Sequence, residues 1–224
     1  HKPRLLISGA SSYSRLIDYK IMFQLARKYN AIHMVDMAHI AGLIAAKVIP
    51  SPSGYADIIT STTHKTLRGP RSGFILSTEQ FAKKIDLATM PGLQGGPFMH
   101  TIAAKAWLFQ YALSIDFIEY QKNILINCQI MINALKEKKI QIIAGGSDNH
   151  LFVINLEPYN KTGKEVASQL SENNIFVNKN IIQKKKKSAF ITSGIRIGTP
   201  FITAQNKSKE EIISIAHKII SIMI

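Results

Sequence analysis

The chain has 224 residues and carries 28 Lys and Arg against 14 Asp and Glu, a formal net charge of +14. Its hydrophobic fraction of 46% is ample for a packed core. No apolar stretch approaches the roughly 18 residues of a membrane span, and no basic-then-apolar leader opens the chain. The single cysteine, Cys128, excludes an intramolecular disulfide and a cysteine metal site, so we expect a reducing compartment, the cytoplasm, and no membrane partner.

The positive charge has two interpretations. The first is compositional drift: the lysines are scattered among many Ile and Asn residues, and an A/T-biased genome enriches a protein in these residue types wherever substitutions are tolerated. A polyanion-binding patch is the alternative. The lysine run at 184–187 has no interleaved aromatic residues for base stacking, so we expect a solvated loop there and no nucleic-acid partner.

Strands and helices are expected to alternate through the first two-thirds of the chain. Strands are predicted at 5–7, 31–35, 57–60 and 74–76, and a helical stripe with spacings of three and four is predicted around 17–29. This β–α–β order predicts a largely parallel sheet covered by helices, with a ligand site beyond the carboxyl ends of the strands. Ser11, Asp36 and Lys65 all lie just past such ends.

The remainder of the chain has a different pattern. Helices are predicted at 101–113 and 116–138, and a strand at 151–156. Thr162 with Glu165, and Ser208 with Glu211, have the spacing of capping boxes that open two further helices. We expect a domain boundary near residue 113, which divides the chain into domains 1–113 and 114–224.

Lys65 lies in the run STTHKTLRGPR, between a buried strand and a Gly/Pro/Arg turn. A lysine that leaves an apolar layer there can be partly desolvated, which lowers the pKa of its amine and favours attack on an aldehyde. His64 and Thr62 supply groups that can orient an imine and relay protons. The alternative is an ordinary surface lysine.

Asp36 ends the run HMVD at the end of a strand that we expect to be buried. A buried carboxylate needs a cation or hydrogen-bond donors, and the protonated pyridine nitrogen of pyridoxal phosphate (PLP) is one such partner. A metal site with His33 and His39 is a rival, but side chains an odd distance apart on an extended chain diverge, so no metal is expected. A structural polar cluster is the remaining alternative.

Two further segments carry polar chemistry. Arg196 lies between glycines in TSGIRIGTP, where a planar guanidinium can bind a carboxylate through two hydrogen bonds or form a structural salt bridge. Backbone N–H groups of the turn Gly92–Pro97 could bind a phosphate, although a plain turn is the alternative.

Five segments, in order, resemble the serine hydroxymethyltransferase family: VDMAH, TTHKTLRGPR, GLQGGP, DNHL and TSGIRIGTP. The resemblance covers nearly the whole chain. It implies an α/β protein of the PLP-dependent transferase fold type I, with residues 1–113 as the second part of a PLP-binding large domain and residues 114–224 as a small domain. It also implies a homodimer that acts on serine, glycine and tetrahydrofolate in one-carbon metabolism and glycine biosynthesis.

The resemblance assigns cofactor roles to residues of this chain. Lys65 would form the Schiff base with PLP, His64 would influence reaction specificity, and Thr62 lies on the same loop. The remaining cofactor contacts would be Asp36 at the ring nitrogen, Ser11 and His39 at the oxygen side of the ring, Arg71 in the pocket wall, and Gly95 and Gly96 at the phosphate of the partner subunit's cofactor.

Substrate contacts follow in the same way. Arg196 would bind the substrate carboxylate, and Asn180, Ser188 and Phe190 would contact the folate. Members of the family are roughly twice as long, so the chain resembles the family from the middle of the large domain onward and is expected to be inactive alone. Ala189 replaces the usual proline in the folate segment. A folate-independent PLP aldolase, an inactive remnant or a basic interaction module are the alternatives.

Overall fold

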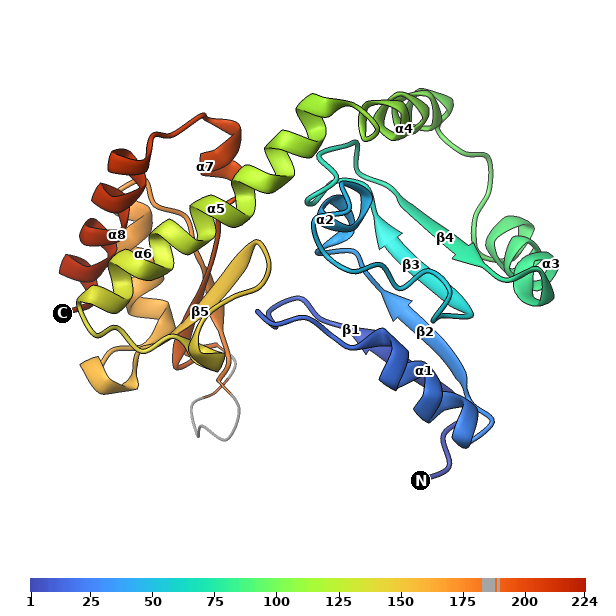
Figure 1. The fold of residues 1–224 in the computed structure, drawn as a ribbon, viewed down its shortest axis with the longest axis horizontal. Coiled ribbons are helices and arrows are strands. Elements are labelled where there is room, and N and C mark those ends of the chain that lie inside the picture. The colour runs from blue at the N-terminus through green and yellow to red at the C-terminus, as the bar shows by residue number, and fades with distance from the viewer. Residues whose placement is uncertain (183–187, 189) are drawn as a thin grey trace. The chain divides into compact units, whose positions relative to one another are not determined.

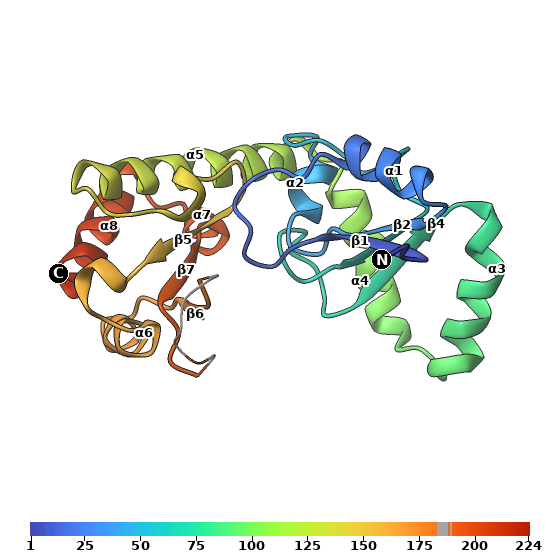
Figure 2. The same cartoon turned by 90° about the horizontal axis from the view of Figure 1, so that it is seen from below.

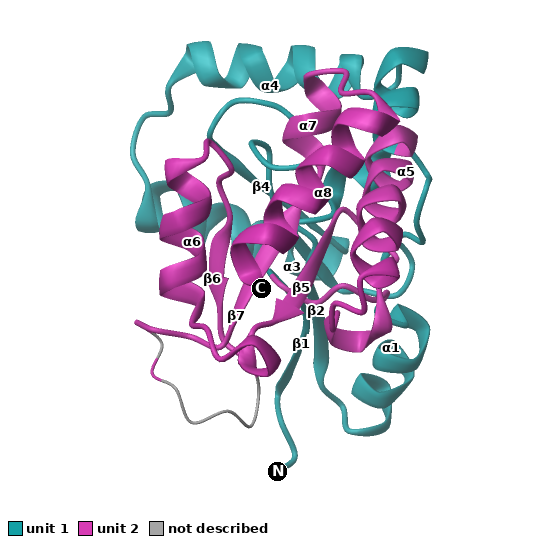
Figure 3. Ribbon diagram, turned by 90° about the vertical axis from the view of Figure 1, so that its left-hand side faces the viewer, with its two compact units in different colours: residues 1–11, 17–121 teal, residues 12–16, 122–224 magenta. Residues whose placement is uncertain are grey.

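The computed structural model of the chain describes residues 1–182, 188 and 190–224. These residues form two compact units, 1–11 with 17–121 and 12–16 with 122–224 (Figure 3). The chain therefore passes from the first unit into the second at residue 12, returns at residue 17, and passes over again within a long helix. The lysine run at 184–187 lies outside the described residues.

The first unit is built on a four-stranded sheet of β1 (Leu5–Gly9), β2 (Ile32–Asp36), β3 (Ile58–Thr62) and β4 (Gly73–Ser77), in that spatial order (Figure 1). The first three strands are parallel, and β4 is antiparallel to β3. All four predicted strands are confirmed, as is the largely parallel sheet. β4 runs the other way because residues 63–72 form a short connection without the helical crossover that a parallel neighbour needs.

Helices cover this sheet. They are α1 (Tyr19–Lys28), α2 (Ala41–Ala45), α3 (Glu79–Leu87) and α4 (Met99–Tyr111), with a π-helical segment η1 (Ala88–Leu93) after α3. α1 begins where the Asp18 carboxylate accepts a hydrogen bond from the Ile21 N–H at 2.9 Å, and it packs over β1 and β2 (Figure 2). The core of this unit contains Val35, Leu67 and Phe117.

The second unit contains an antiparallel sheet in the order β5 (Leu151–Asn155), β7 (Gly194–Gly198) and β6 (Asn178–Asn180). Its helices are α5 (Ile115–Glu137), α6 (Gly163–Glu172), α7 (Pro200–Ala204) and α8 (Lys209–Met223), and its 3-10 turns are η2 (Ile143–Gly145) and η3 (Glu157–Tyr159). Every residue of β5 is buried, because helices pack around it.

Both predicted capping boxes are confirmed. The Thr162 hydroxyl accepts a hydrogen bond from the Glu165 N–H at 3.2 Å, and the Glu165 carboxylate accepts one from the Thr162 N–H at 2.8 Å. Ser208 and Glu211 repeat the pattern at 3.2 and 2.8 Å. These hydrogen bonds satisfy N–H groups that have no partner within the first turn of a helix.

α5 belongs to both units. Phe117 near its start is in the core of the first unit, whereas Cys128 further along is in the core of the second. Burial raises the pKa of the Cys128 thiol to about 12, against smaller opposing effects of hydrogen bonds from Ser147 and Thr199. No helix in the described part of the chain is long and apolar enough to cross a membrane.

Candidate functional site

The carboxyl ends of three parallel strands lie side by side in the first unit. Gly9 of β1 is paired with Asp36 of β2, and Asp36 is paired with Thr60 of β3. Gly9 must be glycine, because a Cβ atom there would lie 2.4 Å from the Asp36 carbonyl oxygen. The segments that follow these strands carry Ser11, His39 and Lys65, so the predicted edge of the sheet is where these residues lie.

Asp36 is exposed, and its Oδ1 accepts a hydrogen bond from the Ala38 N–H at 3.0 Å. The expectation of a buried carboxylate was therefore wrong. Val35 before it is fully buried, but alternation along the strand turns the Asp36 side chain outward at the end of the sheet. One oxygen of the exposed carboxylate orders the turn that follows the strand.

His33 lies on the opposite side of β2 from Asp36. It is fully buried, its Nδ1 is 2.6 Å from the Tyr55 carbonyl oxygen, and its Nε2 is 2.8 Å from the Ser8 hydroxyl. His33 and Asp36 therefore do not share a site. Among the described residues, no three His, Cys, Asp or Glu side chains are grouped as metal ligands.

The loop after β3 is held by two buried threonines. Thr63 donates a backbone hydrogen bond to Ser72 at 3.0 Å, and its hydroxyl donates to the Pro70 carbonyl oxygen at 2.5 Å. The Thr66 hydroxyl donates to the His39 carbonyl oxygen at 3.0 Å and accepts from the Gly42 N–H at 3.0 Å. Lys65 lies between these two fixed points, so its Cα position is set by contacts on both sides.

The Lys65 side chain is exposed. The described residues therefore do not desolvate the Lys65 amine as expected, because β3 ends at Thr62 and residue 65 lies in the loop beyond the apolar core. Two neighbouring polar atoms behave differently. Thr62 Oγ1 and His64 Nδ1 are buried and have no hydrogen-bond partner among the described residues. Since a buried polar atom without a partner is costly, this pair is the strongest structural indication of a polar ligand beside Lys65.

Arg71, Gly95 and Gly96 lie elsewhere in the first unit. All three line a hollow of about 1100 Å³ formed by the ends of β3 and β4, by η1 and by the start of α4. A Cβ atom on Gly95 or Gly96 would meet no described atom within 4 Å, and neither residue has the left-handed backbone that favours glycine. The packing of the described residues therefore does not explain this pair of glycines.

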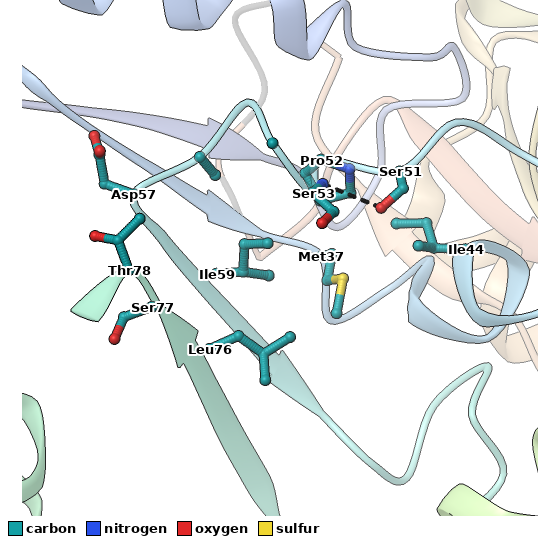
Figure 4. Close-up of a pocket in the computed structure, with 12 residues that line it drawn as sticks. Met37, Ile44, Ser51, Pro52, Ser53, Asp57, Ile59, Leu76, Ser77 and Thr78 are labelled. Carbon is teal, nitrogen blue, oxygen red and sulfur yellow. Dashed lines mark hydrogen bonds between the residues drawn. The ribbon is translucent and has the colours of Figure 1, made fainter. Parts of the chain in front are cut away.

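A second hollow of about 330 Å³ lies between β3, β4 and the loop 51–57, and it contains no predicted site residue (Figure 4). Asp57 in its wall is paired with Arg27 at 2.5 Å and accepts from the His33 N–H at 2.8 Å. Burial raises the pKa of the Asp57 carboxyl, but the hydrogen bonds from Arg27 and His33 outweigh burial and leave this pKa below its ordinary value. Asp57 is therefore part of the structural framework.

Arg196 lies in the middle of β7, between β5 and β6 of the second unit. Its Nη2 donates a hydrogen bond to Asn178 Oδ1 at 2.9 Å, and burial lowers the pKa of its guanidinium. This contact orients a guanidinium that is half-buried against the sheet. An arginine held in this way is suited to binding a carboxylate with two parallel hydrogen bonds.

The predicted folate residues lie around the same strands. Asn180 ends β6 and is paired with Gly194 of β7. The Phe190 carbonyl oxygen accepts a hydrogen bond from Lys179 Nζ at 3.0 Å, while its ring is 82% exposed. The Ser188 carbonyl oxygen accepts from the Thr192 N–H at 2.9 Å. Ala189 lies outside the described residues.

Sequence reasoning missed the polar cluster of Arg15, Asp148 and Asn149 in the second unit. Asp148 and Asn149 belong to the segment DNHL, which carried part of the family resemblance but received no role. In the structure, this segment binds residues 13–16 through a salt bridge and several hydrogen bonds. No local pattern reveals such contacts, because the partners are more than a hundred residues apart in sequence.

The fold and the site define an α/β protein whose sheet presents an amine, a carboxylate and unpartnered polar atoms beyond its carboxyl edge. The model of the family described as serine hydroxymethyltransferase matches residues 1–219. A serine hydroxymethyltransferase of Endomicrobium trichonymphae is 50% identical over 224 residues, which is 100% of this chain and 54% of that relative. The chain belongs to the serine hydroxymethyltransferase family.

Membership of the family confirms the resemblance and the predicted fold class, the PLP-dependent transferase fold type I. The chain spans about half the length of the curated relative that it matches.

Proposed function

We propose that the full-length protein containing this chain transfers the hydroxymethyl carbon of serine to tetrahydrofolate, giving glycine and 5,10-methylenetetrahydrofolate, with PLP as cofactor. The observation that carries this proposal is the family match over residues 1–219, which includes all five motifs. The reaction is reversible and belongs to one-carbon metabolism. A cytoplasmic location is part of the same proposal.

The residues at the sheet edge suit PLP, which presents an aldehyde, a ring oxygen, a pyridine nitrogen and a phosphate. The Lys65 amine is accessible to the aldehyde, and the exposed Asp36 carboxylate is accessible to a protonated ring nitrogen. Ser11 and His39 would contact the oxygen side. The buried, unpartnered Thr62 Oγ1 and His64 Nδ1 support the presence of a polar ligand next to Lys65. When bound, PLP supplies an electron sink for cleaving bonds at the amino-acid α-carbon.

The chain's own groups then have separate tasks. Thr63 and Thr66 fix the backbone on either side of Lys65, which places its amine within a narrow range of positions. His64 can hold or move a proton at Nδ1, because no described group occupies that atom. Arg196, oriented by Asn178, binds the substrate carboxylate.

Folate and the partner subunit complete the proposal. We assign the folate contact to Asn180, Ser188 and Phe190, and the exposed Phe190 ring offers an apolar face to a flat heterocycle. We assign Gly95 and Gly96 to the phosphate of the partner subunit's cofactor in a homodimer. The open space around both glycines supports this assignment, because a backbone without side chains can be approached closely by a phosphate.

Borohydride trapping tests the central assignment. The full-length protein is loaded with PLP, reduced and digested, and the modified peptide is sequenced. We expect the label on Lys65, and we expect Lys65→Ala and Lys65→Arg to lose both the label and the absorbance of lysine-bound PLP. A label on another lysine would refute the assignment. A serine-cleaving rate that depends on tetrahydrofolate supports the proposed reaction, whereas a folate-independent rate would indicate an aldolase.

A further inference from the structure

Lys65 lies in a loop that is closed by two backbone hydrogen bonds. The Arg68 N–H donates to the Lys65 carbonyl oxygen at 2.9 Å, and the Gly69 N–H donates to the Thr63 carbonyl oxygen at 2.8 Å. Thr63 and Thr66 are buried, whereas Lys65 is exposed. A group that holds the buried side of this loop therefore also restrains the Cα atom of Lys65.

Gln121 of α5 contacts the buried side of this loop. Its side chain is fully buried, and its Nε2 donates to the Thr66 carbonyl oxygen at 2.7 Å. A carbonyl oxygen only accepts hydrogen bonds, so this contact fixes which way the Gln121 amide is turned. Gln121 belongs to the same compact unit as the loop, so the contact lies within one unit.

The other end of the Gln121 amide has no partner. Gln121 Oε1 is buried and has no hydrogen-bond partner among the described residues. A buried acceptor without a donor is unfavourable, and an apolar side chain of the same length would fill the space without this cost. Packing alone therefore does not explain a glutamine at this position. The hydrogen bond to the loop is what an apolar residue could not supply.

The loop and Gln121 also pack closely against the start of α2. A Cβ atom on Gly42 would lie 2.2 Å from the Thr66 carbonyl oxygen and 2.7 Å from Gln121 Nε2. The Gly42 N–H donates to the Thr66 hydroxyl at 3.0 Å. Only glycine allows the three segments to come this close, so the Thr66 carbonyl group has little room to move.

The residue before Gln121 makes a second contact between α5 and the loop. The Arg68 guanidinium carbon lies 4.8 Å from the centre of the Tyr120 ring, which is a cation–π contact. Arg68 has a backbone φ of 65°, a value that residues other than glycine rarely adopt. Such a conformation persists where the surrounding contacts hold it. α5 therefore contacts the loop at Thr66 and at Arg68, both shortly after Lys65.

We propose that Gln121 is a positioning residue for the Lys65 amine. This inference rests on the proposed function, in which Lys65 forms the Schiff base with PLP. The Gln121 amide holds the backbone one residue after Lys65. Because the amine is at the end of a flexible and exposed side chain, its range of positions depends on how firmly the backbone is held.

The test uses the full-length protein. Gln121→Met keeps the length of the side chain and removes the hydrogen-bond donor. In the PLP-free protein, the amides of Arg68 and Gly69 should exchange with deuterium roughly 2- to 10-fold faster, the effect of losing one neutral hydrogen bond. In the PLP-loaded protein, kcat should fall roughly tenfold with KM for serine unchanged, because only the placement of the Lys65 amine is altered.

Gln129→Met is the matched control. Gln129 lies on the same helix, and its Nε2 donates to the Ser147 carbonyl oxygen at 2.6 Å in the second unit. This variant should lower Tm about as much as Gln121→Met, but it should leave kcat and the deuterium exchange of loop 63–69 unchanged. A purely stabilising role for Gln121 would give the same result for both glutamines.

Gln121→Glu is the rescue variant. Its carboxyl group can donate to the Thr66 carbonyl oxygen when it is protonated, but not when it is ionised. The exchange rate of the Arg68 amide, divided by that of the original protein at the same pH, should be close to one while the carboxyl is protonated. A ratio raised equally at every pH would count against the hydrogen bond, and this ratio decides if Gln121→Met fails to fold.

Two further results would overturn the inference while leaving the proposed function intact. They are unchanged exchange of the Arg68 and Gly69 amides in Gln121→Met, and an equal loss of kcat in both methionine variants. If the original protein attaches no PLP at Lys65, the proposed function fails. The exchange experiment then still decides whether Gln121 holds the loop, because it is carried out without PLP.

Discussion

The hydroxyl of Thr66 donates a hydrogen bond to the carbonyl oxygen of His39 at 3.0 Å, and this contact joins the loop after β3 to the segment after β2. The same hydroxyl accepts from the Gly42 N–H at 3.0 Å. Gln121 Nε2 adds a third contact by donating to the Thr66 carbonyl oxygen at 2.7 Å. Lys65 is therefore held next to the Asp36 segment by its neighbour and not by its own side chain.

Thr66→Val should destabilise the protein by about 1–3 kcal/mol, because it leaves a buried N–H and a carbonyl oxygen without their partner. Thr66→Ser keeps the hydroxyl and serves as the control, with a smaller loss. Urea unfolding of the full-length protein measures the free energy. Equal stability of the valine variant and the original protein would show that the contact does not hold the loop.

Gly95→Ala should leave Tm unchanged, since a Cβ atom there meets no described atom within 4 Å. It should nevertheless accelerate the loss of PLP during dialysis if the backbone at this position approaches a phosphate. Gly9→Ala provides the contrast, because a Cβ atom 2.4 Å from the Asp36 carbonyl oxygen forces a shift of the backbone and should lower Tm. Unaltered PLP retention in the Gly95 variant would contradict the assigned phosphate contact.

Arg196→Lys keeps the charge but loses the planar fork that Asn178 orients. We expect KM for serine to rise roughly 10- to 100-fold, because losing one hydrogen bond to a charged group weakens binding by about that factor. The absorbance spectrum of bound PLP should stay the same. Steady-state kinetics and absorbance on one preparation separate the two effects. Loss of PLP in parallel with the change in KM would place Arg196 in the cofactor pocket instead.

Asp57→Asn should lower the free energy of unfolding by roughly 1–3 kcal/mol at neutral pH. The loss should not be larger, because the Arg27 side chain is 47% exposed and solvent screens its ion pair with Asp57. The pKa of Asp57 is lower in the folded protein than its ordinary value of 3.8. Its ionised form therefore adds stability above pH 3.8, and this contribution is lost as the pH falls through the folded pKa.

The pH profile of unfolding checks this linkage. The Asp57→Asn variant should show a weaker fall in stability below pH 3.8 than the original protein. Asp86→Asn, which changes an exposed carboxylate of the same unit, is the control and should remain within about 0.5 kcal/mol. Identical acid profiles for the Asp57 variant and the original protein would mean that the pair with Arg27 does not stabilise the fold.

Local sequence determined the strands of the first unit, the starts of the two capped helices and the identity of the motifs. The strands that end near Gly9, Asp36 and Thr62 follow from short apolar runs, and the capping boxes at Thr162 and Ser208 follow from contacts three residues apart. Such features depend on neighbours along the chain, so they can be read from the sequence. The motifs likewise indicated the family and the edge of the sheet where the site lies.

Only the tertiary structure decided the environment of each site residue. Lys65 and Asp36 are exposed in the folded chain. Thr62 Oγ1 and His64 Nδ1 are buried and have no hydrogen-bond partner among the described residues. Arg15 forms an ion pair with Asp148. Burial and long-range hydrogen bonds depend on which segments pack together, and residues 15 and 148 meet only after the chain has crossed between its two units. That dependence on packing is why the contact between residues 15 and 148 carried no signal in the sequence.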